Sequence, residues 1–146
     1  MRTAVVAAIA LAFASTAWAQ RVRFDTEAGM LLYQIKPAKT ADFEAVMEVI
    51  REAMRRSSSP VRQEQAKSLK VYRAAEPSGT NALYVLIMDP VVPSADYDFA
   101  AILKDSMPAA EMARTLKRLN DCSAGKTNKL SLSTNFAAVP PQAPDR

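Results

Sequence analysis

The sequence predicts an α+β domain in which a four-stranded antiparallel sheet carries its helices on one face. Three observations support this prediction. Segments with the two-residue alternation of strands flank segments with helical periodicity in each half of the chain, in the order β-α-β-β-α-β. The stretch from Ala82 to Asp89 is apolar on both faces, which is typical of a strand at the centre of a sheet. Apolar residues make up 49% and charged residues 23% of the 146 positions, as in a single globular domain.

The start of the chain has the layout of a secretory signal peptide over residues 1–19. Arg2 gives a basic start, Ala4–Ala14 is an apolar run too short to span a bilayer, and Ala17-Trp18-Ala19 is a small-x-small cleavage site. We therefore expect cleavage before Gln20 and a periplasmic or secreted protein. The alternative is an ordinary N-terminal helix. No further apolar stretch reaches membrane-spanning length, so no membrane span is expected.

The composition excludes several classes of chemistry. The chain has no His, which excludes imidazole catalysis and His-ligated haem or zinc, and neither a metal nor a cofactor is expected. The mature part carries a formal charge of only +3, with basic residues scattered among acids, so no nucleic-acid partner is expected. Cys122 is the only thiol, which excludes an internal disulfide and leaves a buried thiol, an intermolecular bridge or, least favoured without a His to activate it, catalysis.

The first half of the mature chain begins with a polar, flexible arm at residues 20–28. Met30–Lys36 alternates as a strand, and Pro37 ends it because proline lacks the donor that a sheet ladder needs. Thr40 is an N-cap candidate for the following helix, which Ser57-Ser58-Ser59-Pro60 ends before a polar loop. The expected buried stripe of this helix is Phe43, Val46, Met47, Ile50 and Met54. Its opposite face carries the expected ion pairs Glu48–Arg51, Glu52–Arg55 and Glu52–Arg56.

The middle of the chain predicts a hairpin. Leu69–Ala75 and Ala82–Asp89 read as strands, and the Gly- and Pro-containing segment between them reads as a turn. A short helix is expected over Tyr97–Lys104, with Phe99, Ile102 and Leu103 facing inward. The nearby acids Asp89, Asp96 and Asp98 are expected to cap helices rather than to bind calcium, since a calcium site needs more oxygen ligands at regular spacing.

The last part of the chain predicts one more helix and one more strand. Pro108 suits the first turn of a helix, because its missing N–H costs little there. Lys129–Phe136 alternates strictly and predicts a half-buried strand, while the Pro-rich tail at residues 138–146 is expected to be disordered. The expected buried stripe of the helix is Ala109, Met112, Ala113, Leu116 and Leu119.

This order of elements predicts a ferredoxin-like βαββαβ sandwich over residues 29–137, with both helical segments on one face of the sheet and the first and third strands in its centre. The other sheet face would then be uncovered and largely apolar. A monomer rarely leaves such an area in water, and a second copy is its simplest cover. We therefore expect a homodimer, a dimeric α/β barrel, with two sheets packed around a cavity.

The stretch from Tyr33 to Phe43 (YQIKPAKTADF) resembles the strand, K-P-x-K loop and Phe-initiated helix of the dimeric α/β-barrel superfamily, whose nearest well-known group is the antibiotic biosynthesis monooxygenase-like proteins. The resemblance implies binding of small, often aromatic or polyketide-like molecules between sheet and helices. Some members oxidise them without a cofactor, and others use or degrade haem. The haem branches depend on His, often with Trp, and the mature chain has neither. None of its asparagines or arginines matches a motif of the cofactor-free oxygenases, so these departures argue against transferring enzymatic activity.

The candidate ligand-binding residues are polar side chains near the predicted strands. A Tyr–Lys pair on one sheet face, such as Tyr72 with Lys70, could bind a carboxylate or phenolate. The alternative is that the tyrosines pack at a dimer interface with their hydroxyl groups at the rim. The candidate set is Tyr33, Gln34, Lys70, Tyr72 and Tyr84.

Three functions follow as hypotheses. The first is an exported homodimeric protein that binds a small apolar or aromatic molecule. The second is a cofactor-independent monooxygenase-like enzyme, for which no catalytic residue can be assigned. The third is a structural or interaction protein that binds no ligand and uses the sheet face only to dimerise. A cavity with convergent polar groups would favour the first two hypotheses.

Overall fold

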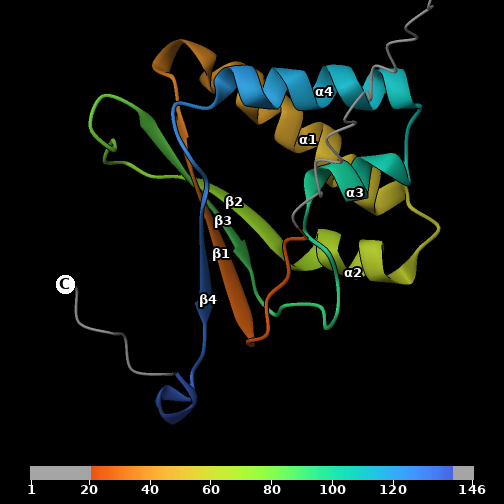
Figure 1. Ribbon diagram of the computed structural model, residues 1–146, viewed down its shortest axis with the longest axis vertical. Helices are drawn as coiled ribbons and strands as arrows, with labels where there is room; N and C mark the ends of the chain where they lie inside the picture. Colours follow the sequence, from red (N-terminus) through yellow and green to blue (C-terminus); the bar gives the residue numbers. More distant parts are fainter. Residues whose placement is uncertain (1–20, 140–146) are drawn as a thin grey trace, which may run out of the picture.

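The computed structural model describes residues 21–139 (Figure 1). The predicted signal peptide at residues 1–19 and the Pro-rich tail from residue 140 lie outside the described residues. The strands are β1 (Ala28–Ile35), β2 (Leu69–Arg73), β3 (Ala82–Met88) and β4 (Asn128–Leu132). The helices are α1 (Thr40–Arg56), α2 (Pro60–Ser68), α3 (Phe99–Lys104) and α4 (Ala109–Cys122), with short 3-10 turns at Pro37–Lys39 and Phe136–Ala138.

The strands form one antiparallel sheet in the order β2-β3-β1-β4. All four helices lie on the same side of this sheet, and the other side is open (Figure 1). The prediction of an α+β fold with an antiparallel sheet is therefore confirmed, and so is the central position of the first and third strands. Within the described residues, no helix is long and apolar enough to cross a membrane.

The hydrophobic core lies between the sheet and α1. The predicted stripe of α1 is buried in full, as far as Met54 at the end of the helix. It packs against the inward side chains of the central strands, such as Ile35 from β1 and Leu86 from β3. Thr40 is not the N-cap of α1: it is the first helical residue, and Lys39 at the cap position makes no side-chain capping bond. The pairs Glu48–Arg51, Glu52–Arg55 and Glu52–Arg56 all form on the outer face.

The polar loop expected after Pro60 is wrong, because these residues form helix α2. Proline at the first helical position leaves no N–H unsatisfied, and the residues that follow have good helix propensity. Polar contacts rather than an apolar stripe hold α2 in place. Gln65 is fully buried, and its Nε2 donates to the Asp96 carbonyl at 3.1 Å, while Arg62 Nη1 donates to the Gln65 Oε1 at 2.8 Å.

Helix α3 begins two residues later than expected, because Asp98 is its cap. The Asp98 Oδ2 accepts a hydrogen bond from the Ala101 N–H at 3.1 Å, so the expected capping role is confirmed for this acid. The inward residues Phe99, Ile102 and Leu103 are buried as predicted.

The burial predicted for the last helix and strand is partly wrong. Of the expected stripe of α4, Leu119 is buried, Met112 and Leu116 are half-buried against the core, and Ala109 and Ala113 are exposed. The helix packs mainly on α1 and α3 and not directly on the sheet, so less of its surface is covered than expected. Strand β4 is an edge strand that pairs only with β1, and all five of its residues are exposed instead of half-buried. Phe136 lies beyond the strand and is 86% exposed.

The segment expected to be a flexible arm at residues 20–28 is packed against the body through Val22 and Phe24. Phe24 is only 5% exposed, and its ring meets the Tyr97 ring edge-on with centroids 5.6 Å apart. The Val22 N–H donates to Asp96 Oδ1 at 3.0 Å, and the Val22 carbonyl accepts from the Tyr97 N–H at 2.7 Å. In the sequence, the alternation of the apolar residues Val22 and Phe24 with charged neighbours is the pattern that indicates this packing.

Candidate functional site

The strand register divides the five candidate residues between the two faces of the sheet. Tyr33 in β1 lies directly opposite Tyr84 in β3, on the face that the helices cover. Gln34, Lys70 and Tyr72 have the opposite parity and lie on the open face. The structure therefore does not bring the five residues into one site.

The open-face candidates stand apart from any enclosed space. Lys70 and Tyr72 share a face as predicted, but both are exposed, Tyr72 at 51%. The Gln34 Nε2 donates to the Ser78 Oγ at 3.1 Å, which ties this amide to the hairpin turn. Within the described residues of one chain, these three side chains therefore do not converge on the carboxylate or phenolate considered above.

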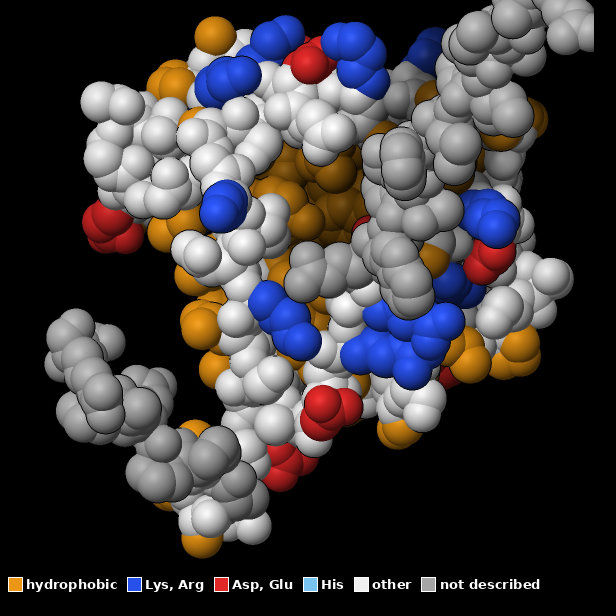
Figure 2. Space-filling view, in the orientation of Figure 1, with side chains coloured by type: hydrophobic (Ala, Val, Ile, Leu, Met, Phe, Trp, Pro, Cys, Tyr) orange, Lys and Arg blue, Asp and Glu red, His pale blue; other side chains and the backbone are white. Residues whose placement is uncertain are grey.

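A cavity of about 260 Å³ lies on the other face, between the sheet and helices α3 and α4. Figure 2 shows it as a hollow with a hydrophobic floor. The packed N-terminal segment contributes Val22 to its wall, and the last turns of α4 contribute several residues. The lining residues are Val22, Leu31, Tyr33, Tyr97, Asp98, Phe99, Ala100, Leu116, Leu119, Asn120, Ser123 and Thr127. We call this space the aromatic cavity.

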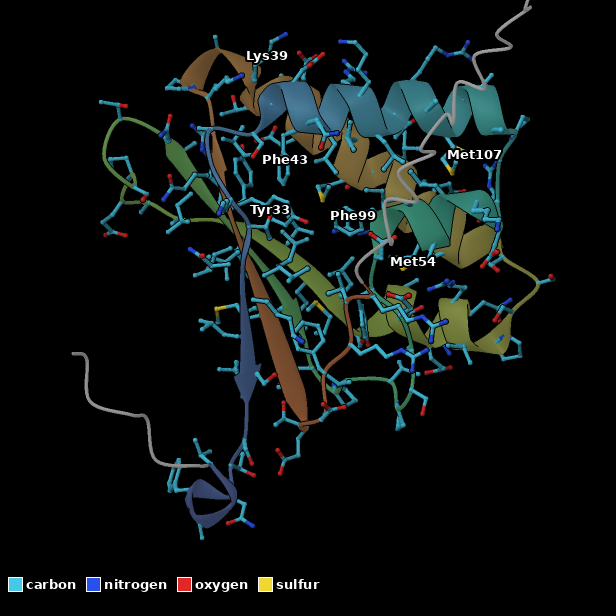
Figure 3. The ribbon with its side chains drawn as sticks, in the orientation of Figure 1. Tyr33, Lys39, Phe43, Met54, Phe99 and Met107 are labelled. Carbon is cyan, nitrogen blue, oxygen red and sulfur yellow. The ribbon has the colours of Figure 1, made fainter. Side chains whose placement is uncertain are left out.

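Three aromatic rings give the aromatic cavity its character. Tyr33 and Phe99 are nearly parallel, with an interplanar angle of 12° and ring centroids 6.1 Å apart. Figure 3 shows both rings in the space between the sheet and the helices, with Phe43 beside them. The third ring, Tyr97, is fixed because its hydroxyl oxygen accepts the Val92 N–H at 2.9 Å. These rings are held by packing, so the cavity is preformed.

The polar groups of the aromatic cavity gather around the Tyr33 hydroxyl. Burial raises the pKa of Tyr33 to about 12; a hydrogen bond with the Thr127 side chain opposes this rise, and the nearby Asp98 carboxylate adds to it. The phenol is therefore protonated at neutral pH, and a protonated hydroxyl can both donate and accept a hydrogen bond. Within the part of the chain that the structure describes, Asp98 is the one charged residue in the lining. The arrangement can hold a small molecule with an apolar ring and a polar end.

Tyr84 performs a different task from Tyr33. Its hydroxyl donates to the Glu44 Oε1 at 2.5 Å, and the Arg73 guanidinium lies over its ring, 5.9 Å from the centroid. Burial, together with the Glu44 carboxylate, raises the pKa of Tyr84 to about 12. Its hydroxyl is already satisfied by α1, and Tyr84 does not line the aromatic cavity. Tyr84 therefore belongs to the core and not to the candidate site.

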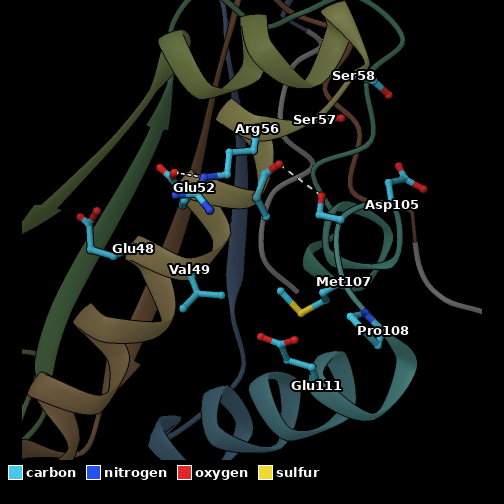
Figure 4. A pocket seen from close by; sticks show the side chains of 12 residues that line it. Glu48, Val49, Glu52, Arg56, Ser57, Ser58, Asp105, Met107, Pro108 and Glu111 are labelled. Carbon is cyan, nitrogen blue, oxygen red and sulfur yellow. Dashed lines mark hydrogen bonds and ion pairs between the residues drawn. The ribbon is translucent and has the colours of Figure 1, made fainter.

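A second hollow is larger but less defined. A groove of about 680 Å³ runs between α1 and the connection from α3 to α4 (Figure 4). Its carboxylates Glu48 and Glu52 pair with arginines on α1, and the Ser106 hydroxyl donates to the Ala53 carbonyl at 3.2 Å. Because these polar groups already have partners and the groove is wide, the aromatic cavity is the better candidate site.

The sequence singled out Tyr33 for ligand binding but missed the residues that surround it. Asp98 was predicted to cap a helix and Phe99 to lie in the core; both predictions hold, but both residues also line the cavity. Thr127 lies in the loop between α4 and β4, where no sequence pattern indicates a role. Within residues 21–139, no group of three or more acidic or Cys side chains is placed to hold a metal ion. Cys122 is a free, buried thiol, and burial raises its pKa.

Comparison with family models, curated proteins and solved structures finds no match to this chain.

Proposed function

We propose that this protein binds a small aromatic or apolar molecule in the aromatic cavity, as an exported homodimer with a ferredoxin-like fold of the dimeric α/β-barrel type. The observation that carries the proposal is the preformed cavity of about 260 Å³, in which the protonated Tyr33 phenol lies among aromatic side chains. Ligand sites are typically concave, mostly apolar and provided with a few polar groups. The volume lies just below the range of drug-sized sites, which favours a ligand of one or two rings.

The homodimer is supported by the open face of the sheet. Antiparallel pairing places Met30, Leu32, Val85 and Ile87 side by side there, in the two central strands. Leu130 and Leu132 of β4 continue this apolar surface to one edge, with 44% and 36% exposure. A contiguous apolar surface of this kind typically marks an interface between proteins. A second copy related by a two-fold axis presents the same surface and is its simplest cover.

Binding is favoured over the cofactor-free monooxygenase alternative. Such an enzyme needs a base that takes a proton from the substrate and a group that stabilises the anion formed. Tyr33 is protonated at neutral pH and is no base. The Asp98 carboxylate could take a proton, but it would repel the anion formed, and the described lining offers no Lys or Arg to stabilise that anion. The residues of the aromatic cavity are suited to hold a molecule rather than to deprotonate it.

Native mass spectrometry of the protein purified from its producing cells tests the proposal, since one spectrum gives both the subunit count and any retained ligand. We expect a dimer with an additional small-molecule mass. Ala100→Leu places a larger side chain into the lining and should remove this mass, whereas Ala113→Leu on the exposed face of α4 should retain it. A spectrum with no bound mass, or one retained equally by Ala100→Leu, contradicts the proposal.

A further inference from the structure

The charge inside the aromatic cavity has only one sign. Among the lining residues that belong to the described range 21–139, Asp98 is the one acidic residue and none is Lys or Arg. The Asp98 Oδ2 caps α3 by accepting the Ala101 N–H, and within the described residues its Oδ1 accepts no hydrogen bond. A second carboxylate or a phenolate placed beside Asp98 would meet a like charge in a partly desolvated space, which is unfavourable.

The ends of two helices border the cavity and offset each other. Leu119, Asn120 and Ser123 lie at the C-terminal end of α4, which favours cations, but its last carbonyls already accept hydrogen bonds, two of them from Lys36. Phe99 and Ala100 lie at the N-terminal end of α3, where the dipole has the opposite sign. The preference for a cation therefore depends on the Asp98 carboxylate and not on the helix ends.

The aromatic rings act in the same direction. The face of a Tyr or Phe ring carries negative charge density, and organic ammonium groups are commonly bound among several such faces. Tyr33, Tyr97 and Phe99 supply three rings around the same space. The protonated Tyr33 hydroxyl also has an oxygen that accepts a hydrogen bond from an ammonium N–H.

Resting on the function proposed above, we infer that the ligand is a small organic amine, bound in its ammonium form with the cation at Asp98 and its apolar part among Tyr33, Tyr97 and Phe99. Lys and Arg side chains do surround the hollow on the surface in Figure 2. Those surface charges are exposed to water and salt, which screen them, whereas Asp98 lies in the lining itself. The charge nearest to the ligand decides the preference.

Three probes that share one ring test this inference by calorimetric titration of the purified protein at pH 7. They are phenethylamine, which is a cation, 2-phenylethanol, which is neutral, and phenylacetate, which is an anion. A hydrogen bond to a charged group is the stronger kind, so we expect phenethylamine to bind about ten-fold more tightly than the alcohol, and phenylacetate to bind most weakly. Ala100→Leu should abolish binding of all three probes.

Asp98→Asn is the decisive variant, because asparagine caps a helix as well as aspartate does but carries no charge. It should reduce the affinity for phenethylamine to that for 2-phenylethanol, and the affinity for the alcohol should not change. Asp98→Ser, also a good cap, provides the same test if the first variant does not fold. Glu111→Gln removes an equal charge beside the other groove and should change none of the affinities.

The outcomes separate this inference from the proposed function. Equal binding of all probes, tighter binding of phenylacetate, or a preference for the amine that survives both Asp98 variants would overturn the amine inference while small-molecule binding stands. Failure of all three probes to bind would overturn both.

Discussion

Tyr33 and Tyr84 lie directly opposite each other on neighbouring strands, and both phenols have a pKa of about 12, yet they face different chemistry. The Tyr84 hydroxyl is tied to Glu44 on α1, at 2.5 Å. The Tyr33 hydroxyl instead lies at the aromatic cavity with Thr127 and Asp98 as neighbours. The same type of residue in the same row of the sheet therefore serves the fold in one strand and the candidate site in the other.

The first prediction concerns these two phenols. Tyr84→Phe should lower the free energy of unfolding by about 1 kcal/mol, because it deletes the hydrogen bond to Glu44. Tyr33→Phe should cost less stability but weaken ligand binding. Urea unfolding and ligand titration of both variants measure the two effects. Equal losses of stability and of binding in the two variants would contradict the division of roles.

The raised pKa values also predict how stability depends on alkaline pH. The folded chain keeps two phenol protons that the unfolded chain, with tyrosine pKa values near 10.0, gives up. Their contribution is fully present below about pH 10 and is lost as pH rises through about 12. Urea unfolding between pH 9 and 12 should show a falling free energy, and each Phe variant should flatten this slope. A slope that neither variant changes would contradict the prediction.

Gly29 provides a test of the packed N-terminal segment. A methyl group at Gly29 would stand 2.5 Å from Cδ1 of Phe24, so Gly29→Ala must displace this buried ring. Overpacking of this kind costs about 1–3 kcal/mol, which urea unfolding measures. Ligand affinity should fall as well, because Val22, two residues before Phe24, lines the aromatic cavity.

A double-mutant cycle separates the clash from other effects. In a Phe24→Leu background the smaller side chain can make room, so Gly29→Ala should cost clearly less than it does alone. Costs that simply add would show that Phe24 is not the obstacle.

Much of the fold could be predicted from local pattern, and the exceptions have physical causes. Alternation and the helical stripe predicted the strands, helix α1 and the central place of β3, because each element buries one apolar face or two. Helix α2 was not predicted because polar contacts hold it in place. Gln65 is buried and hydrogen-bonded to the loop before α3, so the helix has no periodic apolar stripe in the sequence. The alternation of β4 is real, but no segment within residues 21–139 covers its apolar side.

The candidate site was harder to predict than the fold. The sequence identified Tyr33 as a candidate but not the residues that line the cavity with it. Asp98, Phe99 and Thr127 are brought next to Tyr33 only by the tertiary fold. Because β1 carries apolar side chains on both faces, its alternation alone does not decide whether the helices cover the face with Tyr33 or the face with Leu32 and Gln34. Only the pairing register showed that the helices cover the Tyr33 face.

The open sheet face yields a prediction about assembly. Ile87→Glu places a charge at the centre of the proposed interface, next to Lys70 on the neighbouring strand, so the single chain should still fold. Burial of that charge should weaken the dimer by about 3 kcal/mol, or roughly a hundred-fold in affinity. Light scattering coupled to size exclusion should then give the mass of one chain in place of two.

Val61→Glu is the matched control, since Val61 is an equally apolar residue that is 44% exposed on α2, on the helix side of the sheet. It should leave the dimer intact. A wild-type protein that already has the mass of one chain at micromolar concentration, or a dimer that survives Ile87→Glu, would rule out this interface.

The last prediction concerns the clamp between the start of α1 and the end of α4. The Asp42 carboxylate accepts from Arg118 Nη2 at 2.6 Å and from Lys39 Nζ at 2.9 Å, and these hydrogen bonds hold the pKa of Asp42 below its usual value. Because the folded pKa is depressed, this contribution is present above about pH 4 and is lost as pH falls further. Thermal unfolding should show that Asp42→Asn lowers Tm at pH 7 but has little effect at pH 2, and that 1 M salt narrows the difference. Asp121→Asn breaks a pair with Lys117 inside a single helix and should cost less, since it does not separate α1 from α4. If Asp42→Asn lowered Tm equally at both pH values, the residue would act through something other than its charge.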